Sequence, residues 1–401
     1  MLADFVKELP EHDELEGILR SCVHCGFCNA TCPTYQLLGN ELDGPRGRIY
    51  LLKQALEGHP VSRLTQQHLD RCLTCRSCET TCPSGVRYGR LLDIGRTIVD
   101  KRAGRSLREQ IMRGLIKAVF PYRYRFSALL HVARLIKPVL PNALRQKIPV
   151  KHRAVAWPNT GHARKMLILP GCVQQTLAPS IDAAAAHVLN NLGIALLKVQ
   201  DSGCCGALNY HLSDHQNALQ FARNNIDACW PYIEQGAEAI VVTASACGVM
   251  FKDYRELLKH DEEYAEKATK FSALAKDVSE VVVAEDLTIF KADNRKVAFQ
   301  SPCTLQHGQK LTGVVEAILE KAGFQLAATA DGHLCCGSAG VYSLLQPELS
   351  RQLLVNKLEA LEVNQPDIIA TANIGCLSHL QAGSSKKVVH WVELLGKATG
   401  K

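Results

Sequence analysis

The chain has 401 residues, of which 47% are hydrophobic and 21% charged, and a formal net charge of +7. These values predict a globular protein of two or three domains, and no uncharged apolar run is long enough to span a membrane. The acidic, polar N-terminal segment lacks the basic and apolar regions of a secretory signal. The seventeen cysteines fall in metal-ligand spacings, which favours reduced thiolates over a secreted disulfide framework, so we expect a cytoplasmic protein.

Residues 1–100 contain a cysteine run of the form C-x2-C-x2-C-x3-C-P that occurs twice. The two runs are Cys22, Cys25, Cys28, Cys32, Pro33 and Cys72, Cys75, Cys78, Cys82, Pro83. Soft thiolates at this spacing are ligands of [4Fe-4S] clusters, and a tandem pair predicts a helical two-cluster domain of the ferredoxin type. Two zinc knuckles are the alternative, but a four-ligand zinc site would leave the third cysteine of each run without a role.

The fourth cysteine of each run is expected to ligate the other cluster, as in two-cluster ferredoxins. Cluster 1 is then held by Cys22, Cys25, Cys28 and Cys82, and cluster 2 by Cys72, Cys75, Cys78 and Cys32. This crossing would hold the two clusters close together, which suits electron transfer between them.

A basic segment follows, because residues 101–153 contain fourteen Lys or Arg residues and a single acidic residue, Glu109. Apolar residues recur at helical spacing in 107–120 and 126–136, so residues 101–160 are expected to form a linker of basic amphipathic helices. Such helices can pack on neighbouring domains or on a partner subunit, and residues 101–153 can also contact an anionic membrane surface. No nucleic-acid motif accompanies the charge, so we expect no nucleic-acid binding.

The remainder of the chain is an internal repeat offset by 131 residues. Its cysteines are Cys172, Cys204, Cys205 and Cys247 in the first copy, and Cys303, Cys335, Cys336 and Cys376 in the second. Each copy carries a Cys-Cys-Gly triplet, in which Gly206 and Gly337 permit the sharp turn that two adjacent thiolates need to reach one site.

Apolar runs near residues 166–169, 194–199 and 240–243 alternate with helical segments, and the second copy repeats this at 297–299 and 368–370. Such alternation predicts two α/β lobes with parallel sheets, at residues 161–290 and 291–401. Ligands of parallel sheets bind beyond the carboxyl ends of the strands, and the cysteines come directly after those strands. We therefore expect four thiols to gather at the mouth of each lobe.

Three chemistries fit these eight thiols: a third [4Fe-4S] cluster, a zinc site, or thiol chemistry on a substrate. Buried structural cysteines are a fourth interpretation, although eight in register are too many for packing alone. Cys229 has no counterpart in the second copy, and we expect it to be a core residue.

Two ferredoxin runs followed by two Cys-Cys-Gly repeats resemble a family that includes the iron–sulfur subunits of glycolate oxidase, anaerobic glycerol-3-phosphate dehydrogenase and heterodisulfide reductase. Residues 44–48 and 82–89 look like the first two branches, and residues 301–307 and 372–379 look most like the glycolate oxidase branch. Heterodisulfide reductase repeats end in C-x2-C, whereas Cys247 and Cys376 lack that second cysteine. This departure argues against a non-cubane cluster and against disulfide reduction.

The resemblance implies an electron-transfer subunit of a multi-subunit oxidoreductase. Because the basic helices of residues 101–153 would suit delivery of electrons to quinone, we expect the chain to lie peripherally on the inner face of the cytoplasmic membrane. Two FAD-binding partner subunits would oxidise glycolate or a similar 2-hydroxy acid, and this chain would pass the electrons towards quinone. The flavin and the hydroxy acid would then lie on the partners. The same resemblance leaves glycerol 3-phosphate or lactate open as the electron donor, and a zinc-bearing docking platform open as the role of the two lobes.

Overall fold

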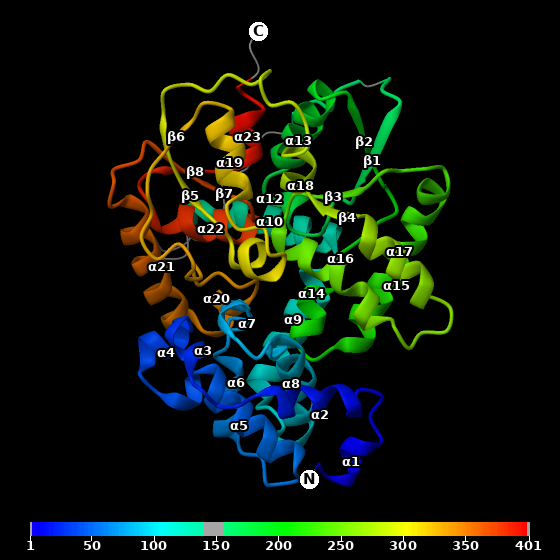
Figure 1. Cartoon of the computed structure of the whole chain (residues 1–401), viewed down its shortest axis with the longest axis vertical. Coiled ribbons are helices and arrows are strands. Elements are labelled where there is room, and N and C mark those ends of the chain that lie inside the picture. The colour runs from blue at the N-terminus through cyan, green and yellow to red at the C-terminus, as the bar shows by residue number, and fades with distance from the viewer. Residues whose placement is uncertain (1, 140–154, 160, 399–401) are drawn as a thin grey trace.

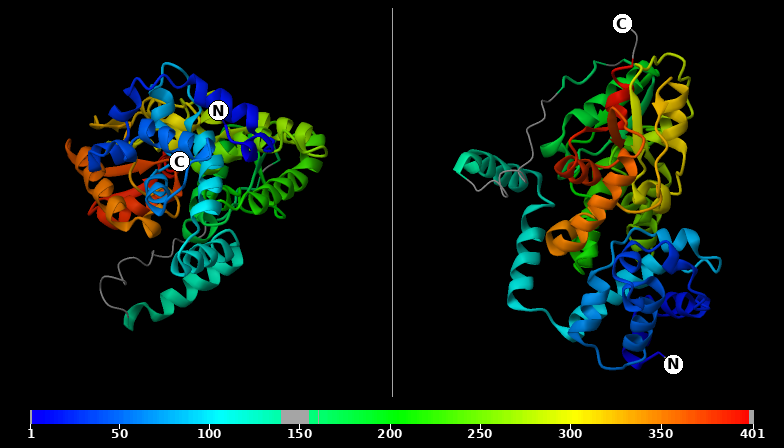
Figure 2. Two further views of the ribbon diagram at one scale, coloured as in Figure 1. Left: turned by 90° about the horizontal axis from the view of Figure 1, so that it is seen from below. Right: turned by 90° about the vertical axis from the view of Figure 1, so that its left-hand side faces the viewer.

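The structure, a computed structural model, describes residues 2–139, 155–159 and 161–398. A helical domain at the N-terminus lies at one end of the molecule, and two α/β lobes stand side by side at the other end (Figure 1). Two helices that follow the helical domain in sequence lie on one side of the molecule and project beyond it (Figure 2). This order agrees with the fold predicted from the sequence.

The helical domain consists of short helices around a small apolar core. Its elements are α1 (Asp4–Lys7), α2 (His12–Ser21), α3 (Phe27–Ala30), α4 (Pro33–Leu38), η1 (Glu41–Asp43), α5 (Pro45–Leu56), α6 (Arg63–Asp70), α7 (Ser77–Thr81) and α8 (Tyr88–Ala103). Helices α5 and α8 approach closely at Gly95, where an added Cβ would come within 2.4 Å of Leu52 Cδ2. Leu15, Leu52 and Leu91 are fully buried in this core, which holds the cysteine-bearing loops in place.

The predicted amphipathic helices are present as α9 (Leu107–Val119) and α10 (Arg123–Ile136), followed by the turn η2 (Lys137–Val139). Ser106 and Glu109 form a capping box at the start of α9, an arrangement that satisfies the first free N–H groups of a helix. The inner side of α10 packs through Phe126 and Leu130 onto Leu177 of the first lobe. Residues 140–154, at the end of the predicted linker, lie outside the described residues.

The two lobes repeat one pattern of strands and helices. The first lobe contains β1 (Arg164–Ile168), α12 (Gln174–Leu177), α13 (Ser180–Asn191), β2 (Ile194–Lys198), α14 (Ala207–His211), α15 (His215–Glu234), β3 (Ile240–Val242), α16 (Ser245–Leu257), α17 (Ala265–Leu274), β4 (Ala275–Asp277) and α18 (Val278–Val282). The second contains β5 (Lys296–Gln300), η3 (Thr304–Gly308), α19 (Val314–Lys321), β6 (Gln325–Leu326), α20 (Tyr342–Leu345), α21 (Pro347–Glu362), β7 (Ile368–Thr371), α22 (Ile374–Gly383), β8 (Lys387–His390) and α23 (Trp391–Leu395).

Both sheets are parallel and have the same strand order, β2-β1-β3-β4 and β6-β5-β7-β8. Leu167 of β1 lies beside Leu197 of β2 and Ile240 of β3, and Ala298 of β5 lies beside Ile369 of β7. Strands buried on both faces are continuously apolar, which explains why these were predictable from sequence. Strands β4, β6 and β8 were not predicted, because they are short or carry polar residues.

The two lobes share one apolar core and meet at the ends of their central strands. The backbone N–H of Ser245, after β3, donates to the carbonyl of Ala372, after β7, at 3.2 Å. The His390 imidazole lies 2.9 Å from the carbonyl of Thr243 across the same junction. The two cysteine-bearing edges are therefore joined through one continuous core. No helix in the described part of the chain combines the length and the apolar character needed to cross a bilayer.

Candidate metal centres

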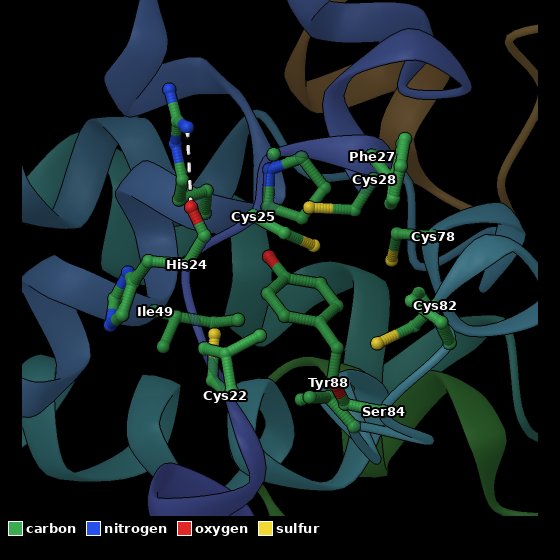
Figure 3. A pocket seen from close by; sticks show the side chains of 16 residues that line it. Cys22, His24, Cys25, Phe27, Cys28, Ile49, Cys78, Cys82, Ser84 and Tyr88 are labelled. Atoms are coloured by element: carbon green, nitrogen blue, oxygen red, sulfur yellow. Dashed lines mark hydrogen bonds between the residues drawn. The ribbon is translucent and has the colours of Figure 1, made fainter.

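A first hollow in the helical domain is lined by Cys22, Cys25, Cys28 and Cys82, with Cys78 at its edge (Figure 3). It encloses about 430 Å³ of non-atom space, part of it open to solvent. Cys22 ends α2, Cys28 lies in α3, and Cys82 follows α7. The turn between Cys25 and α3 uses Gly26 in the left-handed conformation (φ 85°), a conformation that glycine adopts without steric cost.

A second hollow adjoins the first and is lined by Cys32, Cys72, Cys75 and Cys78. It encloses about 310 Å³ of non-atom space. Cys78 and Tyr88 line both hollows, so the two spaces are direct neighbours. In Figure 3 the ring of Tyr88 lies among the sulfur atoms. Each hollow thus brings three cysteines of one run beside the fourth cysteine of the other, with Cys78 also bordering the first hollow, and the crossed ligand assignment stays a prediction.

The thiols of these hollows fit a metal centre better than free thiol chemistry. Burial raises the pKa of Cys28 to about 11, with a further rise from neighbouring Cys22. Burial also raises the pKa of Cys75 and of Cys78 well above the usual thiol range. A reactive cysteine needs a depressed pKa, whereas a bound metal deprotonates its thiol ligands outright. Among the described residues, no three His, Cys, Asp or Glu side chains are arranged around a single-ion position.

A buried guanidinium lies beside the second hollow. Arg48 is fully buried, and its Nη1 lies 4.0 Å from Cys32 Sγ. Its Nε donates to the carbonyl of His68 at 2.8 Å and its Nη2 to Thr34 Oγ1 at 3.0 Å. The buried carboxylate of Asp43 lies 3.7 Å away and also binds the His68 and Arg71 side chains. The sequence showed Arg48 only within a family phrase, and its contact with a thiol ligand was missed.

The first lobe gathers its four predicted thiols where its strands end. Cys172 follows β1, the Cys204–Cys205 pair follows β2, and Cys247 lies in α16 after β3. The four thiols interact with one another: Cys172 and Cys205 raise the pKa of Cys204, and Cys204 and Cys247 lower the pKa of Cys205. The adjacent Gly206 has a φ of 87°, and a Cβ there would lie 2.8 Å from the carbonyl of Ala218.

The second lobe gathers its four thiols in the same way. Cys303 Sγ lies 3.9 Å from Cys335 Sγ, and Cys336 Sγ lies 3.3 Å from Cys376 Sγ. All four cysteines are buried. Gly337 has a φ of 86°, and a Cβ there would lie 2.7 Å from the carbonyl of Ser350, so the Cys-Cys-Gly turn requires glycine as the sequence predicted.

The second lobe's thiols are direct neighbours of the second hollow. Cys303 and Cys335 share a small apolar cluster with Leu73, and Cys75 packs against it. Consistent with this, burial is the largest cause of the raised pKa of Cys75, and the neighbouring Cys303 thiol is the second largest. The Tyr342 hydroxyl strengthens this contact by donating a hydrogen bond to the carbonyl of Arg71 at 3.1 Å.

The first lobe faces the helical domain through charged and polar side chains instead. Arg76 forms an ion pair with Asp253 at 2.7 Å, and His211 lies 3.0 Å from Asp93. Arg90 Nη1 donates to Tyr210 Oη at 2.5 Å. No apolar cluster of the described residues joins the first lobe's thiols to either hollow, so the two lobes are not equivalent neighbours of the helical domain.

Cys229 and His379 support the fold of the lobes. Cys229 is fully buried in the core of the first lobe, as the sequence predicted, and burial raises its pKa to about 12. His379 lies with its Nε2 3.3 Å from Ser350 Oγ, and that hydroxyl donates to the carbonyl of Gly337. His379 therefore supports the Cys-Cys-Gly turn from behind.

Comparison with known proteins agrees with this division of the chain. The 4Fe-4S dicluster domain family matches residues 18–86, and the Cysteine-rich domain family matches residues 166–252 and 297–381. The chain is 53% identical to the glycolate oxidase iron-sulfur subunit of Escherichia coli K12, covering 97% of this chain and 96% of that protein. It is 31% identical to the probable glycolate oxidase iron-sulfur subunit of Bacillus subtilis 168, covering 96% and 95%.

Among solved structures, the chain is similar to the crystal structure of a hypothetical protein from Helicobacter pylori. The TM-score is 0.49 at 13% identity, covering 99% of this chain and 75% of that one.

The buried guanidinium beside the second hollow should be needed for stability. Replacing Arg48 with Met leaves the buried Asp43 carboxylate without part of its counter-charge, and we expect the free energy of unfolding to fall by about 3–5 kcal/mol. Arg46→Met is the matched control, because Arg46 pairs with Glu41 at the surface, where such a pair contributes about 0–1 kcal/mol. Anaerobic urea unfolding followed by circular dichroism measures both. Equal losses in the two variants would contradict the role given to Arg48.

Proposed function

The chain belongs to the family of glycolate oxidase iron–sulfur subunits, and from this we propose that it is the electron-transfer subunit of a flavin-dependent oxidase or dehydrogenase of glycolate or a similar 2-hydroxy acid. The observation that carries the proposal is the continuous row of thiol sets, from the first hollow through the second to the second lobe. Two partner subunits would hold FAD and oxidise the hydroxy acid. This chain would receive the electrons and pass them towards quinone.

Two [4Fe-4S] clusters in the two hollows, and a third in the Cys-Cys-Gly lobes, are the cofactors that this role requires. Such clusters, when bound, accept and release single electrons, and their potentials depend on net charge, hydrogen bonds and solvent exposure. The chain contributes the thiolates, the buried charge of Arg48 and the apolar residues that exclude water. A third cluster is favoured over zinc because the second lobe's thiols are buried against those of the second hollow.

The mouth of the first hollow is the place where we expect a flavin-bearing partner to dock. Cys25 is exposed there, and the side chains beside it, Val23 and Phe27, are 69% and 63% exposed. Exposed apolar residues around an accessible thiol set offer a partner both an interface and a short route to the first cluster.

A direct test uses the complex purified anaerobically from cells that express the chain with its natural partners. We expect the chain to co-purify with flavin, and glycolate to bleach the visible absorbance of the iron–sulfur clusters. Glycerol 3-phosphate and lactate are the comparison substrates, since the donor is held by a partner subunit. Bleaching by either of them in the absence of any response to glycolate would contradict the proposed substrate class and favour another branch of the family.

The number of clusters is tested by iron and acid-labile sulfide content. We expect about twelve irons in the intact chain and about eight after Cys335 and Cys336 are both changed to Ser, because a [4Fe-4S] cluster contains four irons. Cys229→Ser is the matched control, and it should retain about twelve because Cys229 is a core residue. About eight irons in every protein, with zinc in the lobes, would instead support a docking platform.

We also propose that α9 and α10 hold the protein on the inner face of the cytoplasmic membrane. The outer side of α9 exposes an apolar row at helical spacing, with Leu107, Ile111 and Leu115 exposed by 76%, 63% and 61%. Arg108 and Arg125 are exposed on the same two helices. An apolar face with basic residues beside it binds anionic bilayers by combined burial and charge attraction. Residues 140–153 of the predicted membrane segment lie outside the described residues.

Cosedimentation with vesicles that contain anionic lipid tests this surface. Changing Ile111 and Leu115 to Glu removes two apolar anchors of about 1.5–3 kcal/mol each when fully buried and adds like charge, so binding should weaken at least about tenfold. Val355→Glu with Val363→Glu is the control, because both valines are exposed, Val355 in the middle of α21 and Val363 directly after it. If the double Glu variant binds vesicles as before but no longer co-purifies with the flavoprotein, the apolar face of α9 is a docking surface for the partner subunit and not for the membrane.

A further inference from the structure

Lys357 is a buried cation in the second lobe. Its side chain projects from α21, and the residue is only 3% exposed. The Nζ group donates to the carbonyls of Asp331 and Gly332 at 3.1 and 3.2 Å. These carbonyls belong to the loop that leads into Cys335 and Cys336. Two neutral carbonyls satisfy hydrogen bonds but leave the positive charge itself uncompensated, and burying such a charge is costly.

The groups that can compensate this charge are the four cysteines of the second lobe, once they are deprotonated as cluster ligands. Burial lowers the pKa of Lys357, and the opposing contributions come from Cys336, Cys335, Cys376 and Cys303. Geometry points the same way, because the carbonyl of Gly332 that Nζ binds lies only three residues before Cys335 in the loop that carries the thiol pair. The same loop is fixed from the other side, because Gln306 Nε2 donates to the carbonyl of Gly332 at 3.0 Å.

The first lobe has no such cation at the matching position. Gly206 packs against the carbonyl of Ala218 and Gly337 against that of Ser350, which makes Ala218 and Ser350 equivalent positions in the two copies. Seven residues further along each helix lie Asn225 and Lys357. Asn225 is equally buried, but it is neutral and donates to the carbonyl of Cys204 at 2.8 Å. At this position, therefore, the second lobe carries a buried cation where the first lobe carries a neutral amide.

We propose that Lys357 is a positioning residue whose buried charge balances the centre held by Cys303, Cys335, Cys336 and Cys376 and raises its reduction potential. This inference rests on the proposed third [4Fe-4S] cluster. When that cluster takes one electron from the cluster of the second hollow, the donor is oxidised and the acceptor gains one negative charge. A cation enclosed nearby stabilises the added charge strongly, because the surroundings have a low dielectric constant.

The second hollow lies directly beside the lobe that contains Lys357. Cys75 and Cys303 belong to neighbouring thiol sets, so the second lobe is the acceptor that lies next to cluster 2. The first lobe, with Asn225 in place of a cation, contacts the helical domain through the ion pair of Arg76 with Asp253, and no apolar cluster of the described residues joins its thiols to either hollow. Lys357 would thus direct electrons into the second lobe and not the first.

The test is an anaerobic redox titration of the intact complex, with each reduced cluster followed by electron paramagnetic resonance. In Lys357→Met we expect the ratio of reduced to oxidised third cluster, at a fixed potential, to fall about tenfold or more, which equals a shift of about 59 mV for a one-electron couple. Lys357→Arg should restore the parent value, because it keeps the charge. Arg351→Gln removes an exposed charge from the same helix and should leave the potential unchanged.

The outcomes separate this inference from the proposed function. A parent complex with about eight irons and no third signal overturns the third cluster, and this inference with it. About twelve irons in Lys357→Met with an unchanged potential overturns the role of Lys357 alone. If Lys357→Met loses four irons and Lys357→Arg keeps them, the result supports the need for a positive charge at this position. If both variants lose four irons, Lys357 has only a structural role, and the inference is overturned.

Discussion

The structure depends on one electrostatic constraint, the cost of holding several thiolates together away from water. Burial, together with the neighbouring thiols, raises the pKa of Cys75 and of Cys78 well above the usual thiol range. Negative sulfur is stable at such positions only when a metal cluster and nearby cations share its charge. Arg48 beside the second hollow and Lys357 in the second lobe are buried cations at these places. The folding of the helical domain and of the second lobe is therefore tied to the chemistry that they hold.

The same constraint explains which parts of the protein could be predicted from sequence. Cluster ligands must come at fixed short spacings, so the two cysteine runs could be recognised in the sequence as two sets of cluster ligands. The long apolar strands and the glycines of the Cys-Cys-Gly turns were equally predictable from the sequence, because a buried strand requires apolar residues and a positive φ favours glycine. The fold class and the gathering of four thiols in each lobe follow from those residues alone.

The remaining features depend on contacts between distant segments. Lys357 has the sequence context of a solvent-exposed helix residue, and only the packing of α21 against the thiol-bearing loop buries it. Tyr88 lies between the two hollows because α8 packs under both cysteine runs. Strands β4, β6 and β8 are too short or too polar to show a strand pattern, and their places are set by the neighbouring strands. None of these positions has a local pattern that marks it.

The arrangement also gives the electron path a direction. Its first thiol set opens to solvent beside Val23 and Phe27, while the last is enclosed. Ile374 opens the helix that carries Cys376, and the same residue packs in the apolar cluster under α10. The proposed membrane-binding helices therefore rest on the element that bears a ligand of the final centre. Under the proposed function, electrons entering at the exposed mouth would leave near the bilayer, where a quinone is soluble, and α9 and α10 would hold that exit at the membrane surface.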